Sequence, residues 1–137
     1  MNTLTRQQKA YHMKNKNTAP ELVCQTLIKR LGINFSTHKQ VGGCFPDIII
    51  EDAKLVIFVH GCYWHNHGCT IYSAVMKDEF ITNARIRKTI NKDKQNLDAV
   101  RKEGYRALVI WECELKNLTE VESRLIRRLN LSARDIR

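Results

Sequence analysis

Three histidines and two cysteines crowd into one ten-residue segment, and no other feature constrains the fold of this chain as strongly. The segment reads His60-Gly61-Cys62-Tyr63-Trp64-His65-Asn66-His67-Gly68-Cys69. A structural zinc ion prefers thiolate and imidazole ligands in a closed tetrahedron. Cys62, His67 and Cys69 lie near enough in the sequence to share one ion, and Cys113, which follows a predicted strand, is the best fourth ligand. Buried free cysteines are the alternative, but they leave the gathering of histidines unexplained.

The cysteine count and the lack of long apolar runs indicate the compartment. The N-terminal residues show neither an apolar core nor a secretory cleavage site, and no apolar run is long enough to span a bilayer. The five cysteines are odd in number, which argues against a disulfide framework. We therefore expect a cytoplasmic protein with no membrane segment.

The positive charge of the chain is unevenly distributed. The net charge is +9, and the residues before Asp47 include seven Lys or Arg but only one acid, Glu21. A basic arm that leads into a compact domain suits a polyanion such as nucleic acid; a solubilising surface is the alternative. We predict that residues 1–17 form a basic N-terminal arm that becomes ordered on a partner such as DNA, with a short helix as the alternative, and that residues 18–137 form a single domain.

Helical and strand patterns alternate along the chain and predict a mixed α/β fold. The predicted helices cover about 18–31, 78–103 and 119–129, and the predicted strands cover part of 33–41, 47–51, 55–59 and 105–111. Capping boxes are expected at Thr18 with Glu21 and at Thr119 with Glu122. The strands at 47–51 and 55–59 are predicted to form a hairpin. This order predicts a central mixed β-sheet flanked by helices.

Two acids stand where an apolar residue is expected. Asp47 opens an apolar strand, and burying an unpaired carboxylate is costly, so it either binds a metal such as magnesium or lies in an ordinary turn. Asp93 shares the helical stripe of Ile86, Ile90, Leu97 and Val100. It is therefore expected to face inward toward a partner such as a histidine; pairing with Arg85 or Lys88, or exposure to solvent, is the alternative.

Taken together, these residues resemble the bacterial very-short-patch repair (Vsr) endonucleases, which nick DNA beside a T·G mismatch. The matching stretches are Asn17 to Glu21, Phe45-Pro46-Asp47, Val56 to Cys69, Asp93, and Gly104 to Cys113. The match spans about residues 5–130. It implies a bacterial, restriction-endonuclease-like core with a structural zinc, in which the domain 18–137 is a magnesium-dependent endonuclease that leaves a 5′-phosphate and a 3′-hydroxyl.

The resemblance also implies roles for residues around the scissile phosphate. Magnesium would be held by Asp47 and by the backbone carbonyl of Val59. His65 would act as general base or orient the attacking water. His60 and Asp93 would hold metal-bound waters or neighbouring imidazoles. Glu21, which the spacing marks first as a capping residue, matches an acidic position near the site.

The zinc and DNA contacts implied by the resemblance agree with the ligand chemistry above. Zinc would be bound by Cys62, His67, Cys69 and Cys113. The aromatic rings of Tyr63 and Trp64 would wedge into the base stack beside the mismatch, where unstacking costs less. The expected partner is double-stranded DNA, bound by a monomer.

The chain departs from the family pattern in several places. Threonine is common at the Val59 position, and a tryptophan expected after the zinc loop is missing, with Phe80 the nearest aromatic residue. The Glu-x-Lys motif of typical restriction enzymes is absent, and the N-terminal arm diverges. Two alternatives therefore stay open: a nuclease of restriction or phage defence that cuts paired DNA, and a zinc-stabilised DNA-binding module without catalysis.

Overall fold

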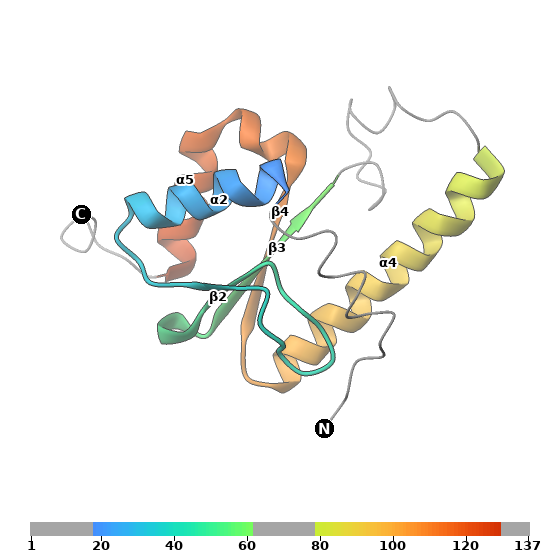
Figure 1. The fold of residues 1–137 in the computed structure, drawn as a ribbon, viewed down its shortest axis with the longest axis horizontal. Coiled ribbons are helices and arrows are strands. Elements are labelled where there is room, and N and C mark those ends of the chain that lie inside the picture. The colour runs from blue at the N-terminus through green and yellow to red at the C-terminus, as the bar shows by residue number, and fades with distance from the viewer. Residues whose placement is uncertain (1–17, 62–78, 130–137) are drawn as a thin grey trace.

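The computed structural model describes residues 18–61 and 79–129, with the side chains of 79–86 left out. The predictions for the basic arm 1–17 therefore fall outside the described residues. A mixed sheet lies at the centre of the fold (Figure 1). Its strands run in the order β1 (Ser36–Thr37), β2 (Ile48–Ile50), β3 (Leu55–His60) and β4 (Arg106–Trp111).

The pairing of the strands confirms the predicted hairpin and the predicted mixed sheet. β1 and β2 are antiparallel, and so are β2 and β3, where Ile48 pairs with Ile57. β3 and β4 are parallel, in a register that runs from Leu55 opposite Arg106 to His60 opposite Trp111. The edge strand expected within 33–41 is present as β1, which is only two residues long.

Helices cover both faces of the sheet, as predicted. α2 (Ala19–Arg30) and α5 (Leu118–Leu129) lie on one face, and α4 (Glu79–Lys102) runs across the other (Figure 1). Two short 3-10 helices, η1 (Glu51–Ala53) and η2 (Glu112–Lys116), follow β2 and β4. Within the described residues, no helix combines the length and the apolar character needed to cross a membrane.

The side chains of β3 alternate between two hydrophobic clusters. Leu55 and Ile57 pack with apolar residues of α2 and α5, whereas Val56 and Phe58 pack with Val100 of α4. A strand that is covered on both faces needs apolar residues at nearly every position, which explains the unbroken Leu-Val-Ile-Phe-Val run. The two clusters fix β3 between the helix layers, so that the end of β3 at His60 has a defined position.

The capping prediction is correct for α2 and wrong for α5. The carboxylate of Glu21 accepts hydrogen bonds from the backbone N–H and from the hydroxyl of Thr18, at 3.1 and 2.6 Å. At α5, the side-chain oxygen of Asn117 accepts the N–H of Glu120 at 3.2 Å, so the helix begins before Thr119. Asparagine and threonine are both suitable N-cap residues. The 3-10 helix η2 ends at Lys116, so α5 follows directly after Asn117 and Asn117 is the residue that caps it.

The loop between β1 and β2 is held against α4. Gly42 has a φ of +59°, and a Cβ at this position would lie 3.2 Å from the carbonyl oxygen of Ala99. The thiol of Cys44 lies 3.9 Å from the carbonyl oxygen of Asn96, and Val41 and Cys44 form an isolated β-bridge. These contacts fix the loop that leads from β1 to Asp47.

Candidate active site

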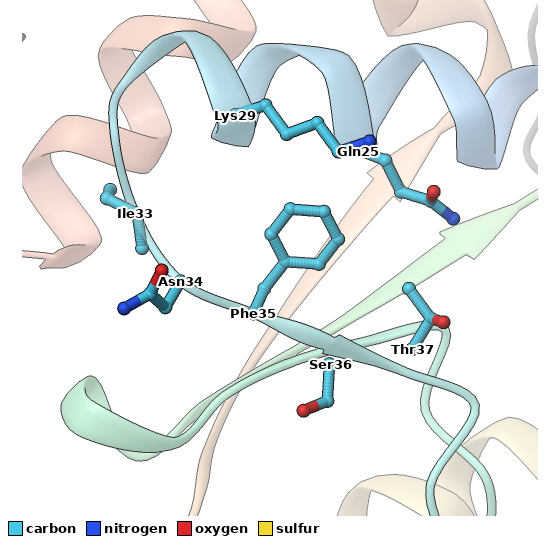
Figure 2. A pocket seen from close by; sticks show the side chains of 7 residues that line it. All are labelled: Gln25, Lys29, Ile33, Asn34, Phe35, Ser36 and Thr37. Atoms are coloured by element: carbon cyan, nitrogen blue, oxygen red, sulfur yellow. The ribbon is translucent and has the colours of Figure 1, made fainter.

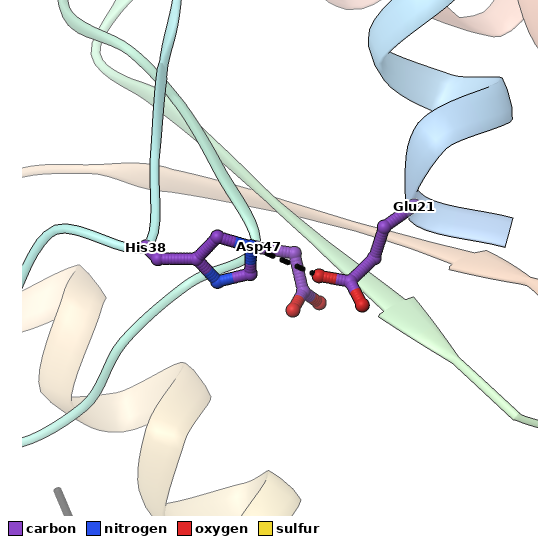
Figure 3. Close-up of side chains that lie close together, drawn as sticks. All are labelled: Glu21, His38 and Asp47. Carbon is purple, nitrogen blue, oxygen red and sulfur yellow. Dashed lines mark ion pairs between the residues drawn. The ribbon is translucent and has the colours of Figure 1, made fainter. Parts of the chain in front are cut away.

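Three polar side chains from separate segments converge near the start of β2. Glu21 comes from the first turn of α2, His38 from the loop after β1, and Asp47 from the residue that precedes β2 (Figure 3). A donor atom of each lies within 4.8 Å of a donor atom of the other two. The Nε2 atom of His38 and the Oε1 atom of Glu21 are 3.2 Å apart.

Asp47 is anchored to the neighbouring strand. Its Oδ2 atom accepts the backbone N–H of Val59 at 2.7 Å, which joins the start of β2 to the end of β3. Burial, followed by the negative charge of Glu21, raises the pKa of Asp47 well above its usual range. The hydrogen bond from Val59 opposes this shift, and a side-chain interaction with Glu21 adds to it. The carboxylate is therefore positioned rigidly, and its negative charge is disfavoured in the metal-free protein.

Glu21 serves both the helix start and the cluster. One carboxylate oxygen, Oε2, caps α2 through Thr18. The other, Oε1, is buried, and its contact among the described residues is the Nε2 atom of His38 at 3.2 Å, which is not aligned as a hydrogen bond. Since the whole residue is only 3% exposed, this oxygen cannot rely on bulk water. The capping role and the site role predicted for Glu21 are thus compatible.

The donor set of this cluster fits a divalent cation. Buried carboxylates that lie side by side repel each other, and a bound cation offsets this repulsion. Carboxylate oxygens suit magnesium and manganese, and the underused Oε1 atom of Glu21 faces the same space as Asp47. The chain therefore has the residues that the expected metal requires.

A second cluster lies at the end of β3. The Nε2 atom of His60 lies 3.6 Å from the Oδ1 atom of Asp93, and both side chains are mostly buried. The His60 ring also meets the Trp111 ring edge-on, with centroids 5.1 Å apart. The inward orientation predicted for Asp93 is confirmed, and a histidine, His60, is a partner of its carboxylate.

The two clusters flank the same end of the sheet. Val59 packs with the α2 and α5 side, whereas His60, the next residue, pairs with Asp93 of α4. Asp47 reaches the backbone of Val59 from the adjacent strand. The structure thus brings Glu21 and Asp47 together, and His60 and Asp93 together, on either side of residues 59–60.

His38 was not identified from the sequence. It is a lone histidine in a short polar segment, without periodicity or a spaced partner. Its contact with Glu21 joins residues 17 positions apart, which follows from the packing of the β1–β2 loop. Its position eight residues before Pro46-Asp47, where a strand begins, indicates a role in the site only weakly.

Most of the residues predicted to bind zinc or DNA fall outside the described part of the chain, namely Cys62, Tyr63, Trp64, His67 and Cys69. The predicted general base, His65, also falls outside it. Cys113 is described, and it lies partly exposed in η2. It follows Trp111 by two residues, and Trp111 is the register partner of His60. The zinc ligand set stays a prediction.

Cys24 and Cys44 are expected to resist alkylation in the folded protein. Burial raises the pKa of the Cys24 thiol to about 12, with a further rise from Asp47, and burial raises the pKa of Cys44 to about 11. Because the thiolate is the reactive form, Cys24 should react about a thousandfold more slowly at pH 8 than an exposed thiol. Mass spectrometry after iodoacetamide treatment measures this, with the urea-unfolded protein as control. Rapid labelling of either residue before unfolding would contradict the packing around it.

A surface hollow of about 500 Å³ lies apart from both clusters. It is formed by α2 and the segment around β1 (Figure 2). Its lining residues are Gln25, Lys29, Ile33, Asn34, Phe35, Ser36 and Thr37. None of them belongs to the Glu21–His38–Asp47 cluster or to the His60–Asp93 pair, so the hollow is not part of the candidate active site.

Comparison with protein families gives one match that covers more than half of the chain. The family model described as DNA mismatch endonuclease Vsr matches residues 1–71. This span contains Glu21, His38 and Asp47, as well as the whole segment from His60 to Cys69 that is dense in histidine and cysteine.

Individual proteins are similar over most of the chain. The type II nicking enzyme V.XorIIP of Xanthomonas oryzae pv. oryzae is 35% identical over 82% of this chain and 83% of its own length. The DNA mismatch endonuclease Vsr of Escherichia coli is 27% identical over 82% of this chain and 72% of its own length. Among solved structures, the catalytic domain of the homing endonuclease I-Bth0305I superposes with a TM-score of 0.58 at 26% identity, over 82% of this chain and 94% of that domain.

Proposed function

Since this chain belongs to the DNA mismatch endonuclease Vsr family, we propose that it nicks one strand of double-stranded DNA next to a T·G mismatch, with magnesium bound at Asp47. Its family and its structural neighbour are those of DNA endonucleases and nicking enzymes. The core is proposed to be restriction-endonuclease-like, with a structural zinc beside the site. The basic surface of the chain suits a DNA backbone.

The observation that carries this proposal is a pair of carboxylates at the end of the sheet, with Glu21 buried and Asp47 largely buried. Asp47 is locked to the backbone of Val59 by a 2.7 Å hydrogen bond, and Glu21 adds a second, underused carboxylate oxygen. A DNA-binding module without catalysis has no use for such a pair, because two adjacent buried carboxylates cost stability. A divalent cation bound between the two carboxylates and a DNA phosphate would offset their repulsion.

Each residue of the site is proposed to have a separate role in phosphodiester hydrolysis. Asp47, Glu21 and the backbone carbonyl of Val59 would hold magnesium, which neutralises charge on the scissile phosphate and stabilises the leaving oxygen. His65 is proposed as general base or water-orienting residue. Asp93 keeps the His60 imidazole in place through the contact at Nε2, and the edge of Trp111 restricts its rotation. A histidine held in this way keeps one tautomer and one orientation.

The segment between β3 and α4 is proposed to deliver the substrate. Zinc on Cys62, His67, Cys69 and Cys113 would brace this segment, and Tyr63 and Trp64 would insert beside the mispair. Unstacking a base step costs a few kcal/mol and costs less at a mismatch. Selectivity for T·G over T·A would follow from that difference.

A second candidate function keeps the site and changes the substrate. The relative at 35% identity is named a type II nicking enzyme, and several other relatives carry the same description. This similarity favours an enzyme that works beside a restriction system and reads particular flanking bases. In that case nicking would depend on the sequence around the target base pair.

The test uses a pool of duplexes with one central T·G pair and two randomised base pairs on each side. A matched pool carries T·A instead, and the two strands bear different fluorescent labels. We expect magnesium-dependent nicking of the T·G pool, on one strand only, and little nicking of the T·A pool. Sequencing of the nicked ends gives the flanking preference.

The other outcomes separate the alternatives. Equal nicking of both pools would keep the endonuclease and reject mismatch recognition. Nicking confined to one T·A sequence would favour a restriction or defence role. Intact DNA in every pool, with tight binding retained, would favour the zinc-stabilised binding module.

A further inference from the structure

His38 is placed unusually for a loop residue. Its side chain is 8% exposed, and its backbone has a φ of +56°, in the left-handed region that few residues with a side chain adopt. The loop that holds it is packed on α4 through Gly42 and Cys44. The fold therefore fixes this imidazole beside the carboxylates of Glu21 and Asp47.

The geometry points to His38 as a third side-chain ligand of the cation that Asp47 and Glu21 hold. This inference rests on the proposed function, because it concerns the same ion. It adds a residue that lies outside the metal set expected from the sequence, namely Asp47 and the carbonyl of Val59. It also changes the class of cation that the site should prefer.

The donor atoms are spaced as one ion requires. An octahedral cation with ligands at about 2.1 Å keeps adjacent donors about 3 Å apart and opposite donors about 4.2 Å apart. The Nε2 atom of His38 and the Oε1 atom of Glu21 are separated by 3.2 Å, and the donors of all three residues lie within 4.8 Å. Small side-chain adjustments are enough to bring them onto one ion.

An imidazole ligand favours a transition metal. Magnesium takes oxygen ligands, whereas imidazole suits the divalent metals that are higher in the Irving–Williams order, and manganese accepts both kinds of ligand. Two carboxylates with one imidazole should therefore bind Mn²⁺ more tightly than Mg²⁺. Without His38 the remaining oxygen donors should discriminate less between the two ions.

A purely structural role for His38 makes a different prediction. If the imidazole only holds Glu21 in place, its loss would weaken Mg²⁺ and Mn²⁺ equally, and no nitrogen would be bonded to the ion. A direct nitrogen ligand is visible in the pulsed electron paramagnetic resonance spectrum of bound Mn²⁺ as coupling to ¹⁴N. This readout does not depend on activity.

The test is a titration of the zinc-loaded, full-length protein with Mn²⁺ in the absence of DNA. Free Mn²⁺ is followed by its paramagnetic resonance signal, and Mg²⁺ affinity is obtained by competition. The test variant is His38→Asn, because asparagine tolerates the left-handed backbone and its shorter side chain removes the imidazole. The matched control is Gln40→Ala, an exposed neutral residue of the same loop. The thermal midpoint of each metal-free variant checks that it folds.

We expect His38→Asn to weaken Mn²⁺ binding at least about tenfold, to weaken Mg²⁺ less, and to remove the ¹⁴N coupling. Gln40→Ala should bind both ions like the parent protein. Unchanged Mn²⁺ affinity in His38→Asn would overturn the inference, and so would a parent spectrum without ¹⁴N coupling or a coupling that persists in the variant.

Asp47→Asn separates this inference from the proposed function. If Asp47→Asn loses Mn²⁺ while His38→Asn keeps it, the metal site of the proposed function stands and only the role of His38 fails. If Mn²⁺ binds equally well to both variants, the cation lies elsewhere, and the proposed site fails with the inference.

Discussion

Replacing Asp47 with asparagine should abolish magnesium-dependent nicking. Asparagine keeps the oxygen that accepts the Val59 N–H, so the strand junction is preserved while the charge is lost. A cation contributes several kcal/mol to stabilising a phosphoryl transition state, and each 1.36 kcal/mol is tenfold in rate. We therefore expect nicking of the preferred duplex to fall about a thousandfold or more in single-turnover measurements.

The same substitution should make the metal-free protein more stable at neutral pH. Because the pKa of Asp47 is raised in the folded state, the folded protein holds a proton that the unfolded chain releases at its usual pKa of 3.8. Stability is therefore lost as the pH rises above 3.8 toward the raised pKa, and the full cost is present beyond it. Asp47→Asn removes this cost, so its thermal midpoint should exceed that of the parent by several degrees at pH 7.5.

Calorimetry with and without magnesium measures the thermal midpoints of the parent protein and of Asp47→Asn. Magnesium should raise the midpoint of the parent protein but not that of Asp47→Asn. The stability difference between the two metal-free proteins should shrink as the pH falls toward 4. Asp52→Asn is the matched control, since this exposed aspartate lies in η1 at the other end of the hairpin and should change neither property. A less stable Asp47→Asn, or one that still nicks, would contradict the role assigned to Asp47.

Removing zinc should have the largest effect on stability. Structural zinc in small domains binds with an apparent free energy of about 10–16 kcal/mol, which is comparable to the whole stability of a domain, about 5–15 kcal/mol. We expect about one zinc per chain, and a fall of more than 10 °C in the thermal midpoint when Cys113→Ala or a strong chelator removes it.

Elemental analysis and thermal unfolding give the two readouts for zinc. Cys44→Ala is the matched control, because Cys44 is a buried free thiol on the α4 side and should leave the zinc content unchanged. A parent protein without zinc, or a Cys113→Ala variant with full zinc content and an unchanged midpoint, would remove Cys113 from the ligand set.

Local patterns predicted most of the elements that build this fold. The helix from Thr18, the hairpin of β2 and β3, and the strand β4 all depend on periodicity and end signals within a few residues, and each was correct. The inward position of Asp93 followed in the same way, because helical spacing places it on the stripe of Leu97 and Val100. The predicted N-cap of α5 was wrong because Asn117 and Thr119 are both polar and lie two residues apart. The end of η2 fixes where α5 begins, and this favours Asn117.

Residue type alone identified Asp47, His60 and the predicted zinc ligands as chemically unusual, since charges and thiols in apolar or clustered settings need partners. Which partners they find was decided by tertiary structure. His60 meets Asp93 because β3 and α4 pack face to face. Glu21 meets His38 because the β1–β2 loop is pinned on α4 at Gly42 and turns through a left-handed backbone. A contact of that kind depends on how segments distant in the sequence pack together, so it cannot be predicted from local periodicity.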